Sequence, residues 1–174
     1  MTLADMVQEV FASEGVLARA DTHFQPRDGQ TRMAVAVART MEQGGALVVE
    51  AGTGVGKTFA YLVPALLSGE RVLLSTATKA LQDQLFARDL PQLAQTLGVP
   101  VRIALLKGRA SYLCLYRMER ARQEILGQER GVARVLAKVE AWSTSTRSGD
   151  LAELTGLDER SPVIPLITST RENC

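Results

Sequence analysis

The chain has 174 residues, of which 46% are hydrophobic and 22% are charged, and its formal net charge at pH 7 is +1. These values are ordinary for a globular protein with one sizeable core, and they exclude a chain that is basic overall, so any nucleic-acid binding would use a local patch. There is no secretory signal, no apolar run near the ~20 residues of a membrane span, and no cysteine besides Cys114 and Cys174. We therefore expect a cytoplasmic protein without a disulfide scaffold or a membrane partner.

Two amphipathic helices are expected near the start of the chain, because residues 3–13 and 31–42 place apolar side chains at helical spacing. Between them, Phe24, Arg27 and Gln30 form a candidate adenine site. The amide of Gln30 has a donor and an acceptor that could pair with the N6 and N7 edge of adenine, while Phe24 could pack on the base and Arg27 could add a polar or stacking contact. An ordinary loop at the start of the second helix is the alternative, which these residues alone leave open.

A glycine-rich loop follows between a predicted strand at 46–49 and a predicted helix at 59–67, the order that a phosphate-binding loop requires. Backbone N–H groups of such a loop, together with the helix N-terminus, bind phosphate oxygens. As the catalytic pair, Lys57 would reach the β- and γ-phosphates and Thr58 would bind Mg²⁺. The first position of the motif is alanine instead of glycine, which fits if no positive φ is needed there. The predicted nucleotide-binding residues of the loop are Ala51, Gly52, Thr53, Gly54, Val55, Gly56, Lys57 and Thr58.

Two further apolar runs, at 72–76 and 101–106, predict a second and a third strand, with helices expected between them at 79–88 and 90–97. An alternation of strands and helices at this spacing predicts a parallel α/β sheet. Functional groups of such sheets gather at the carboxyl ends of the strands, which is where the candidate motifs of this chain lie.

Hydroxyl groups and a lysine follow the second predicted strand, at Thr76, Thr78 and Lys79. Such groups at the start of a helix could bind the phosphodiester backbone of DNA. The alternative is an ordinary helix N-cap by Thr76 or Thr78, and this segment alone favours the N-cap.

The character of the chain changes after residue 106. A polar loop at 107–114 leads to a long helical stretch at 115–142, with an interruption expected near Gly127 and Gly131. Its interleaved arginines and glutamates favour a solvated helix face, and a Ser/Thr-rich linker follows at 143–150. Cys114 lies beyond the basic run that begins at Lys107, a neighbourhood that favours a thiolate. A small buried thiol is the alternative, since two cysteines and one histidine complete neither a Cys₄ cluster nor a zinc site.

Four motifs in this order resemble the DinG/XPD-type superfamily 2 DNA helicases, and most closely the bacterial DinG and YoaA branch. They lie at residues 24–30, 51–58, 74–85 and 107–114. In that family the first is the Q motif, which reads adenine, and the second is motif I. The third is motif Ia, which touches single-stranded DNA, and the fourth leads to the first cysteine of a [4Fe–4S] cluster.

The resemblance implies a RecA-like P-loop NTPase fold, with residues 1–107 as the amino-terminal part of helicase domain 1 and 108–174 as the start of a mostly helical iron–sulfur insertion. It implies ATP, Mg²⁺ and a [4Fe–4S] cluster as cofactors, with Cys114 and Cys174 as the first two cluster ligands. The implied partners are single-stranded and forked DNA, and proteins of replication or repair are candidates. The implied activity is ATP-driven translocation and duplex unwinding, of 5′-to-3′ polarity.

The family's Asp-Glu-x-His box and second RecA-like domain are missing from these 174 residues, which end on a cysteine. We therefore expect a truncated chain that by itself neither hydrolyses ATP nor unwinds DNA. Two other interpretations stay open: a P-loop ATPase or kinase of another class, and a truncated nucleotide- or DNA-binding module without catalysis.

Overall fold

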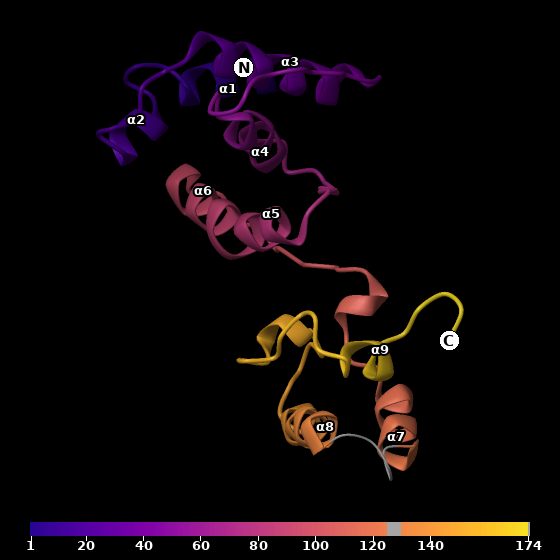
Figure 1. The fold of residues 1–174 in the computed structure, drawn as a ribbon. Helices are drawn as coiled ribbons and strands as arrows, with labels where there is room; N and C mark the ends of the chain where they lie inside the picture. The colour runs from indigo at the N-terminus through magenta and orange to yellow at the C-terminus, as the bar shows by residue number, and fades with distance from the viewer. Residues whose placement is uncertain (125–129, 174) are drawn as a thin grey trace. The chain divides into compact units, whose positions relative to one another are not determined.

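The structure is a computed structural model that describes residues 1–124 and 130–173. It divides into two compact units, unit 1 with residues Met1–Leu105 and unit 2 with residues Leu106–Cys174 (Figure 1). Each unit has a hydrophobic core of its own. No helix in the described part of the chain is long and apolar enough to cross a membrane.

In unit 1, α1 (Leu3–Val10) packs against α3 (Asp28–Gln43), and α3 packs against α4 (Lys57–Leu67). The amphipathic spacing of the first helix buries Val7, and the side chain of Phe11 closes its C-terminal end. Leu62 and Val63 of the fourth helix complete this core. The elements of unit 1 are α1 Leu3–Val10, α2 Val16–Ala20, α3 Asp28–Gln43, α4 Lys57–Leu67, α5 Lys79–Gln84, η1 Leu85–Asp89 and α6 Leu90–Leu97.

The two helices expected at 79–88 and 90–97 form one continuous helical stretch. Its middle segment, η1, is π-helical, and this wider winding carries the chain from α5 into α6 without a loop. Single π-helical turns inside α-helices are uncommon and often accompany functional positions.

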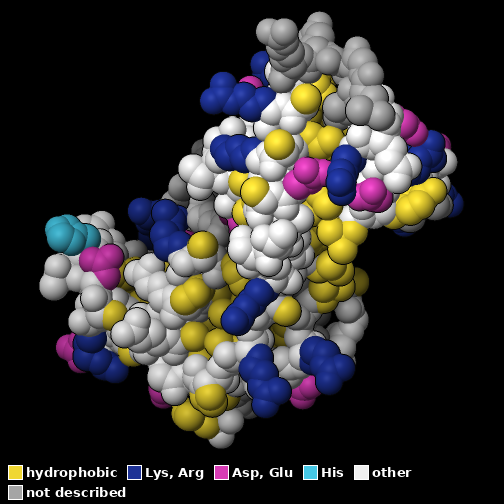
Figure 2. All heavy atoms as spheres, turned by 90° about the horizontal axis from the view of Figure 1, so that it is seen from below, with side chains coloured by type: hydrophobic (Ala, Val, Ile, Leu, Met, Phe, Trp, Pro, Cys, Tyr) yellow, Lys and Arg dark blue, Asp and Glu magenta, His cyan; other side chains and the backbone are white. Residues whose placement is uncertain are grey.

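The predicted parallel sheet is not found: among the described residues the structure contains isolated β-bridges but no strand. The apolar segments 46–49, 72–76 and 101–106, which sequence patterning assigned to strands, have no regular secondary structure. The physical reason is that a strand needs backbone partners beside it, and none of the described backbone hydrogen bonds joins these segments. Several of their apolar side chains consequently face solvent, such as Val48 with 97% and Leu73 with 92% exposure, while Leu74 packs against the core of unit 1. Figure 2 shows hydrophobic side chains spread over the face in view.

Unit 2 begins with the polar loop and is also mainly helical. The segment expected as one long helix at 115–142 forms two helices, and the break predicted near Gly127 lies outside the described residues. Val139, Val163 and Ile167 form the centre of its core. The elements of unit 2 are η2 Arg109–Ser111, α7 Leu115–Glu124, α8 Arg130–Ser143, η3 Leu151–Glu153 and α9 Ile164–Ile167.

Candidate nucleotide-binding site

The glycine-rich loop leads directly into α4, with Gly56 as the N-cap and Lys57 as the first helical residue. Gly54 and Gly56 have φ angles of +78° and +86°, in the left-handed region that favours glycine. A Cβ on Gly56 would also lie 2.1 Å from Nε2 of Gln30. Ala51 adopts no positive φ, so the alanine at the first motif position is compatible with this loop.

The ammonium group of Lys57 lies over the loop that precedes it. Its Nζ donates to the carbonyl oxygens of Ala51 at 2.8 Å and Gly52 at 2.6 Å. No salt bridge to Lys57 occurs within the described residues. The positive charge of Lys57 and the positive end of the α4 dipole are therefore both available to an anion at the loop.

The candidate adenine residues contact the loop itself. Arg27 donates from Nη1 to the carbonyl of Gly54, and Gln30 donates from Nε2 to the carbonyl of Gly56 at 2.9 Å. Gln30 is buried, which fixes the direction of its amide. Phe24 packs toward the core, where its ring centroid lies 6.5 Å from that of Phe11. The structure thus brings Arg27 and Gln30 to the phosphate loop and turns Phe24 toward the hydrophobic core.

Thr58 belongs to a cluster with Tyr61 and Asp89 that the sequence did not predict. Burial raises the pKa of the Tyr61 hydroxyl, an interaction with the Thr58 hydroxyl opposes this rise, and the negative charge of Asp89 adds to it. Asp89 is buried, and its carboxylate accepts hydrogen bonds from Gln84 at 2.7 Å and from Arg88 at 2.9 Å. The spacing of three between Thr58 and Tyr61 puts both on one helix face, but nothing in the sequence points to Asp89 on η1.

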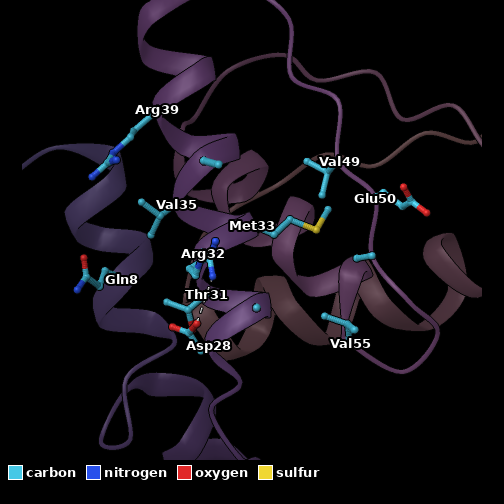
Figure 3. A pocket seen from close by; sticks show the side chains of 13 residues that line it. Gln8, Asp28, Thr31, Arg32, Met33, Val35, Arg39, Val49, Glu50 and Val55 are labelled. Atoms are coloured by element: carbon cyan, nitrogen blue, oxygen red, sulfur yellow. Dashed lines mark ion pairs between the residues drawn. The ribbon is translucent and has the colours of Figure 1, made fainter.

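A cavity of about 820 Å³ lies beside the loop, between α3 and the segment 49–51. Figure 3 shows Val35 and Met33 from α3 on one side and Val49 with Glu50 on the other. Its polar groups include the ion pair between Arg32 and Asp28, with 3.7 Å between Nη1 and Oδ2. Ala51 and Val55 of the glycine-rich loop line this cavity, whereas Lys57 and Thr58 do not.

The candidate DNA-binding residues lie at the start of α5. Thr78 is the N-cap, and its side-chain oxygen accepts from the N–H of Leu81 at 3.3 Å. The Thr76 hydroxyl donates to the carbonyl of Thr78 at 3.2 Å, and Lys79 is exposed. The N-cap alternative is therefore realised by Thr78, while a DNA contact by these three residues stays a prediction.

Cys114 lies directly before α7, where the helix N-terminus favours a thiolate. A hydrogen bond from Ser169 is the main cause that lowers the pKa of its thiol, and the N–H groups of Arg117 and Tyr116 and the charge of Arg117 act in the same direction against burial. A thiol with these surroundings fits a metal ligand. The described residues contain no group of three or more potential metal ligands, and Cys174 lies outside them.

Residues 31–146 match the DEAD/DEAH box helicase family, which is more than half of the chain. The chain belongs to this family. It is 46% identical over 175 residues to the ATP-dependent DNA helicase YoaA of Haemophilus influenzae, an alignment that covers 100% of the chain and 27% of that relative. It is 48% identical over 167 residues to YoaA of Escherichia coli, with 94% of the chain and 26% of the relative covered. The ATP-dependent helicase DinG of Mycobacterium tuberculosis is 44% identical over 157 residues, with 78% of the chain and 24% of the relative covered.

These comparisons confirm the resemblance to YoaA and DinG helicases that the four motifs indicated. Membership of the DEAD/DEAH box family implies a RecA-like fold, although the described residues show only its helices. The matched range contains Lys57, Lys79 and Cys114 but begins after Arg27 and Gln30. The chain spans about a quarter of the length of these relatives.

Proposed function

We propose that this chain contributes the phosphate-binding half of the ATP site to an ATP-dependent DNA helicase. The observation that carries this proposal is Lys57 at the first position of α4, directly after the left-handed Gly56, in a chain of the DEAD/DEAH box family. Two of its relatives are named ATP-dependent DNA helicases.

In the proposed site, an incoming triphosphate replaces the carbonyl oxygens of Ala51 and Gly52 as partner of the Lys57 ammonium. A phosphate oxygen is the stronger acceptor because it carries charge. The Thr58 hydroxyl would hold Mg²⁺, and the loop N–H groups and the α4 N-terminus would stabilise negative charge on the phosphates. Arg27 and Gln30 hold the loop carbonyls in place, and the remaining acceptor of the Gln30 amide is free to take part in adenine recognition.

We further propose that ATP binding and hydrolysis drive movement along single-stranded DNA and unwinding of forked duplexes, with 5′-to-3′ polarity, in replication or repair. Lys79 and the hydroxyls of Thr76 and Thr78 would contact phosphates of the DNA strand. Such contacts are independent of base sequence. The apolar segments 46–49, 72–76 and 101–106 would be strands of the parallel sheet of the RecA-like fold.

Unit 2 is proposed as the start of an iron–sulfur insertion. Cys114 and Cys174 would be two of the cluster ligands, and the thiolate-favouring surroundings of Cys114 support this assignment. A [4Fe–4S] cluster held by cysteine thiolates would supply a structural crosslink between distant segments and a redox-active centre.

The proposal is tested by phosphate release from ATP in the full-length protein, with and without single-stranded DNA. We expect DNA to stimulate hydrolysis and Lys57→Ala to reduce it by about 10²-fold or more, because a developing charge loses its stabilising cation. The control variant Arg71→Ala removes an exposed cation of the same unit and should hydrolyse ATP like the wild type. Hydrolysis that DNA leaves unchanged would favour a P-loop ATPase or kinase of another class, and nucleotide binding without hydrolysis would favour a binding module.

A further inference from the structure

A buried ion pair joins the first residues of unit 2 to the segment that precedes η3. Nζ of Lys107 lies 2.7 Å from Oδ2 of Asp150, and the two side chains are only 4% and 11% exposed. The other carboxylate oxygen of Asp150 accepts from the N–H of Ala152 at 3.0 Å. Burying two charges is costly, so an ion pair in this position indicates a requirement for a defined geometry more than a gain in stability.

Further contacts join Lys107 and residues 149–150 to the backbone that leads to Cys114. The N–H of Lys107 donates to the hydroxyl of Tyr112 at 2.9 Å, and Tyr112 forms an antiparallel bridge with Asp150. The N–H of Leu113 donates to the carbonyl of Gly149 at 2.8 Å. Residues 107–113 are therefore attached to residues 149–150 by the ion pair and by backbone contacts.

Cys114 is held from a second side as well. Its N–H donates to the carbonyl of Ile167 at 2.8 Å, and Leu113 forms an antiparallel bridge with Thr168. The thiol accepts a hydrogen bond from Ser169. The segment that carries the thiol thus lies between residues 149–150 and residues 167–169, and the second of these leads toward Cys174.

We propose that Lys107 and Asp150 are positioning residues for the iron–sulfur cluster, and that their ion pair, with the Tyr112 hydroxyl, fixes the Cys114 thiol before a cluster binds. This inference rests on the proposed function, because it takes Cys114 as a ligand. Their effect on the thiol passes through the backbone at 112–114. Preorganisation of this kind slows the loss of a ligand, because the thiolate cannot move away without breaking a buried ion pair.

The test uses the full-length protein purified without oxygen. Iron and acid-labile sulfide per chain are measured, then the rate of cluster loss to an iron chelator, and finally the electron paramagnetic resonance spectrum of the reduced cluster. We expect Lys107→Met and Asp150→Asn to lose the cluster about tenfold faster or more, the size typical of residues that orient metal ligands, and to alter the spectrum. Lys107→Arg keeps the charge and should stay close to the wild type.

The matched control is the exposed ion pair between Arg120 and Glu124 on α7, whose Nη2 and Oε1 lie 2.8 Å apart. Arg120→Met and Glu124→Gln should leave the cluster-loss rate and the spectrum unchanged. Circular dichroism and thermal unfolding report whether each variant is folded, and if Asp150→Asn is not, Tyr112→Phe removes only the hydroxyl and decides by the same measurements. A wild-type protein without iron would overturn both the proposed cluster and this inference. A wild-type protein with the cluster and variants that keep it equally well would overturn this inference alone.

Discussion

Gly56 is subject to two constraints that the neighbouring Gly52 escapes. Its φ of +86° is strained for any residue with a Cβ, and the added atom would collide with the Gln30 amide. Gly52 has no positive φ, and a Cβ there would meet nothing within 4 Å. The glycines of the loop are therefore not equivalent, although the motif alone presents them in the same way.

We expect Gly56→Ala to destabilise the nucleotide-free full-length protein by at least about 1–2 kcal/mol, the cost of a left-handed conformation for an L-residue. The collision with Gln30 adds to this cost. Thermal unfolding without nucleotide measures the effect, and Gly52→Ala is the control that should unfold like the wild type. Equal unfolding of the two variants would contradict the geometry of Gly56 described above.

Asp5 provides a prediction about pH. Hydrogen bonds from the backbone N–H and the hydroxyl of Thr2 hold the pKa of the Asp5 carboxyl below its ordinary value of 3.8. A carboxyl whose pKa is lowered in the folded state contributes stability above its unfolded pKa, and this contribution disappears as the pH falls through the folded pKa. Asp5→Asn should therefore lower the unfolding temperature near pH 7, and the difference from the wild type should shrink below pH 3.8. In a Thr2→Ala background, which keeps the backbone N–H but removes the hydroxyl, the same substitution should have a smaller effect near pH 7.

Helices and strands of this chain differ in how well sequence predicts them, and the difference is physical. The spacing of Val7 and its neighbours defines α1 locally, because a helix satisfies its backbone within the same segment. The apolar run that contains Val48 has the composition of a buried strand, but a strand is completed only by a neighbour, and no neighbour pairs with it among the described residues.

Lys57 and Gly56 of the candidate site were predictable because their motif is contiguous in sequence. The contacts of Gln30 with Gly56, and of Lys107 with Asp150, were not, since they join residues far apart in the chain.

The π-helical element η1 depends on one buried carboxylate. Asp89 accepts hydrogen bonds from Gln84 and Arg88, so Asp89→Ala removes a buried carboxylate together with both of these bonds. We expect a loss of about 1.5–3 kcal/mol in the free energy of unfolding, the size typical of hydrogen bonds to a charged group. Chemical unfolding of the full-length protein, followed by circular dichroism, provides the measurement.

The control for Asp89 is Asp28, an aspartate on α3 whose ion pair with Arg32 is exposed. Exposed ion pairs contribute about 0–1 kcal/mol, so Asp28→Ala should unfold close to the wild type. If both substitutions cost the same, Asp89 does not stabilise η1 through its hydrogen bonds.

At the scale of the whole molecule, the exposed apolar segments determine how the chain behaves alone. Val48 and Leu73 face solvent in segments whose backbone groups have no strand partner among the described residues. Unpaired apolar segments of this kind favour association with other chains, and a net charge of +1 gives little repulsion to oppose it. The combined substitution Val48→Thr and Leu73→Thr should therefore reduce light scattering and dye binding by the 174-residue chain. Leu115→Thr, an exposed leucine on the helix α7, is the control and should change both signals much less.

The same pair of substitutions should have the opposite consequence in the full-length protein. If the segments around Val48 and Leu73 are buried strands there, each threonine places a hydroxyl in an apolar interior, and the melting temperature should fall. We therefore expect less light scattering and dye binding by the 174-residue chain, and a lower melting temperature of the full-length protein. The reason is that the segments around Val48 and Leu73 are exposed in the 174-residue chain and would be covered in the full-length protein. An unchanged melting temperature in the full-length protein would show that these segments do not become sheet strands, and would remove the parallel sheet from the proposed function.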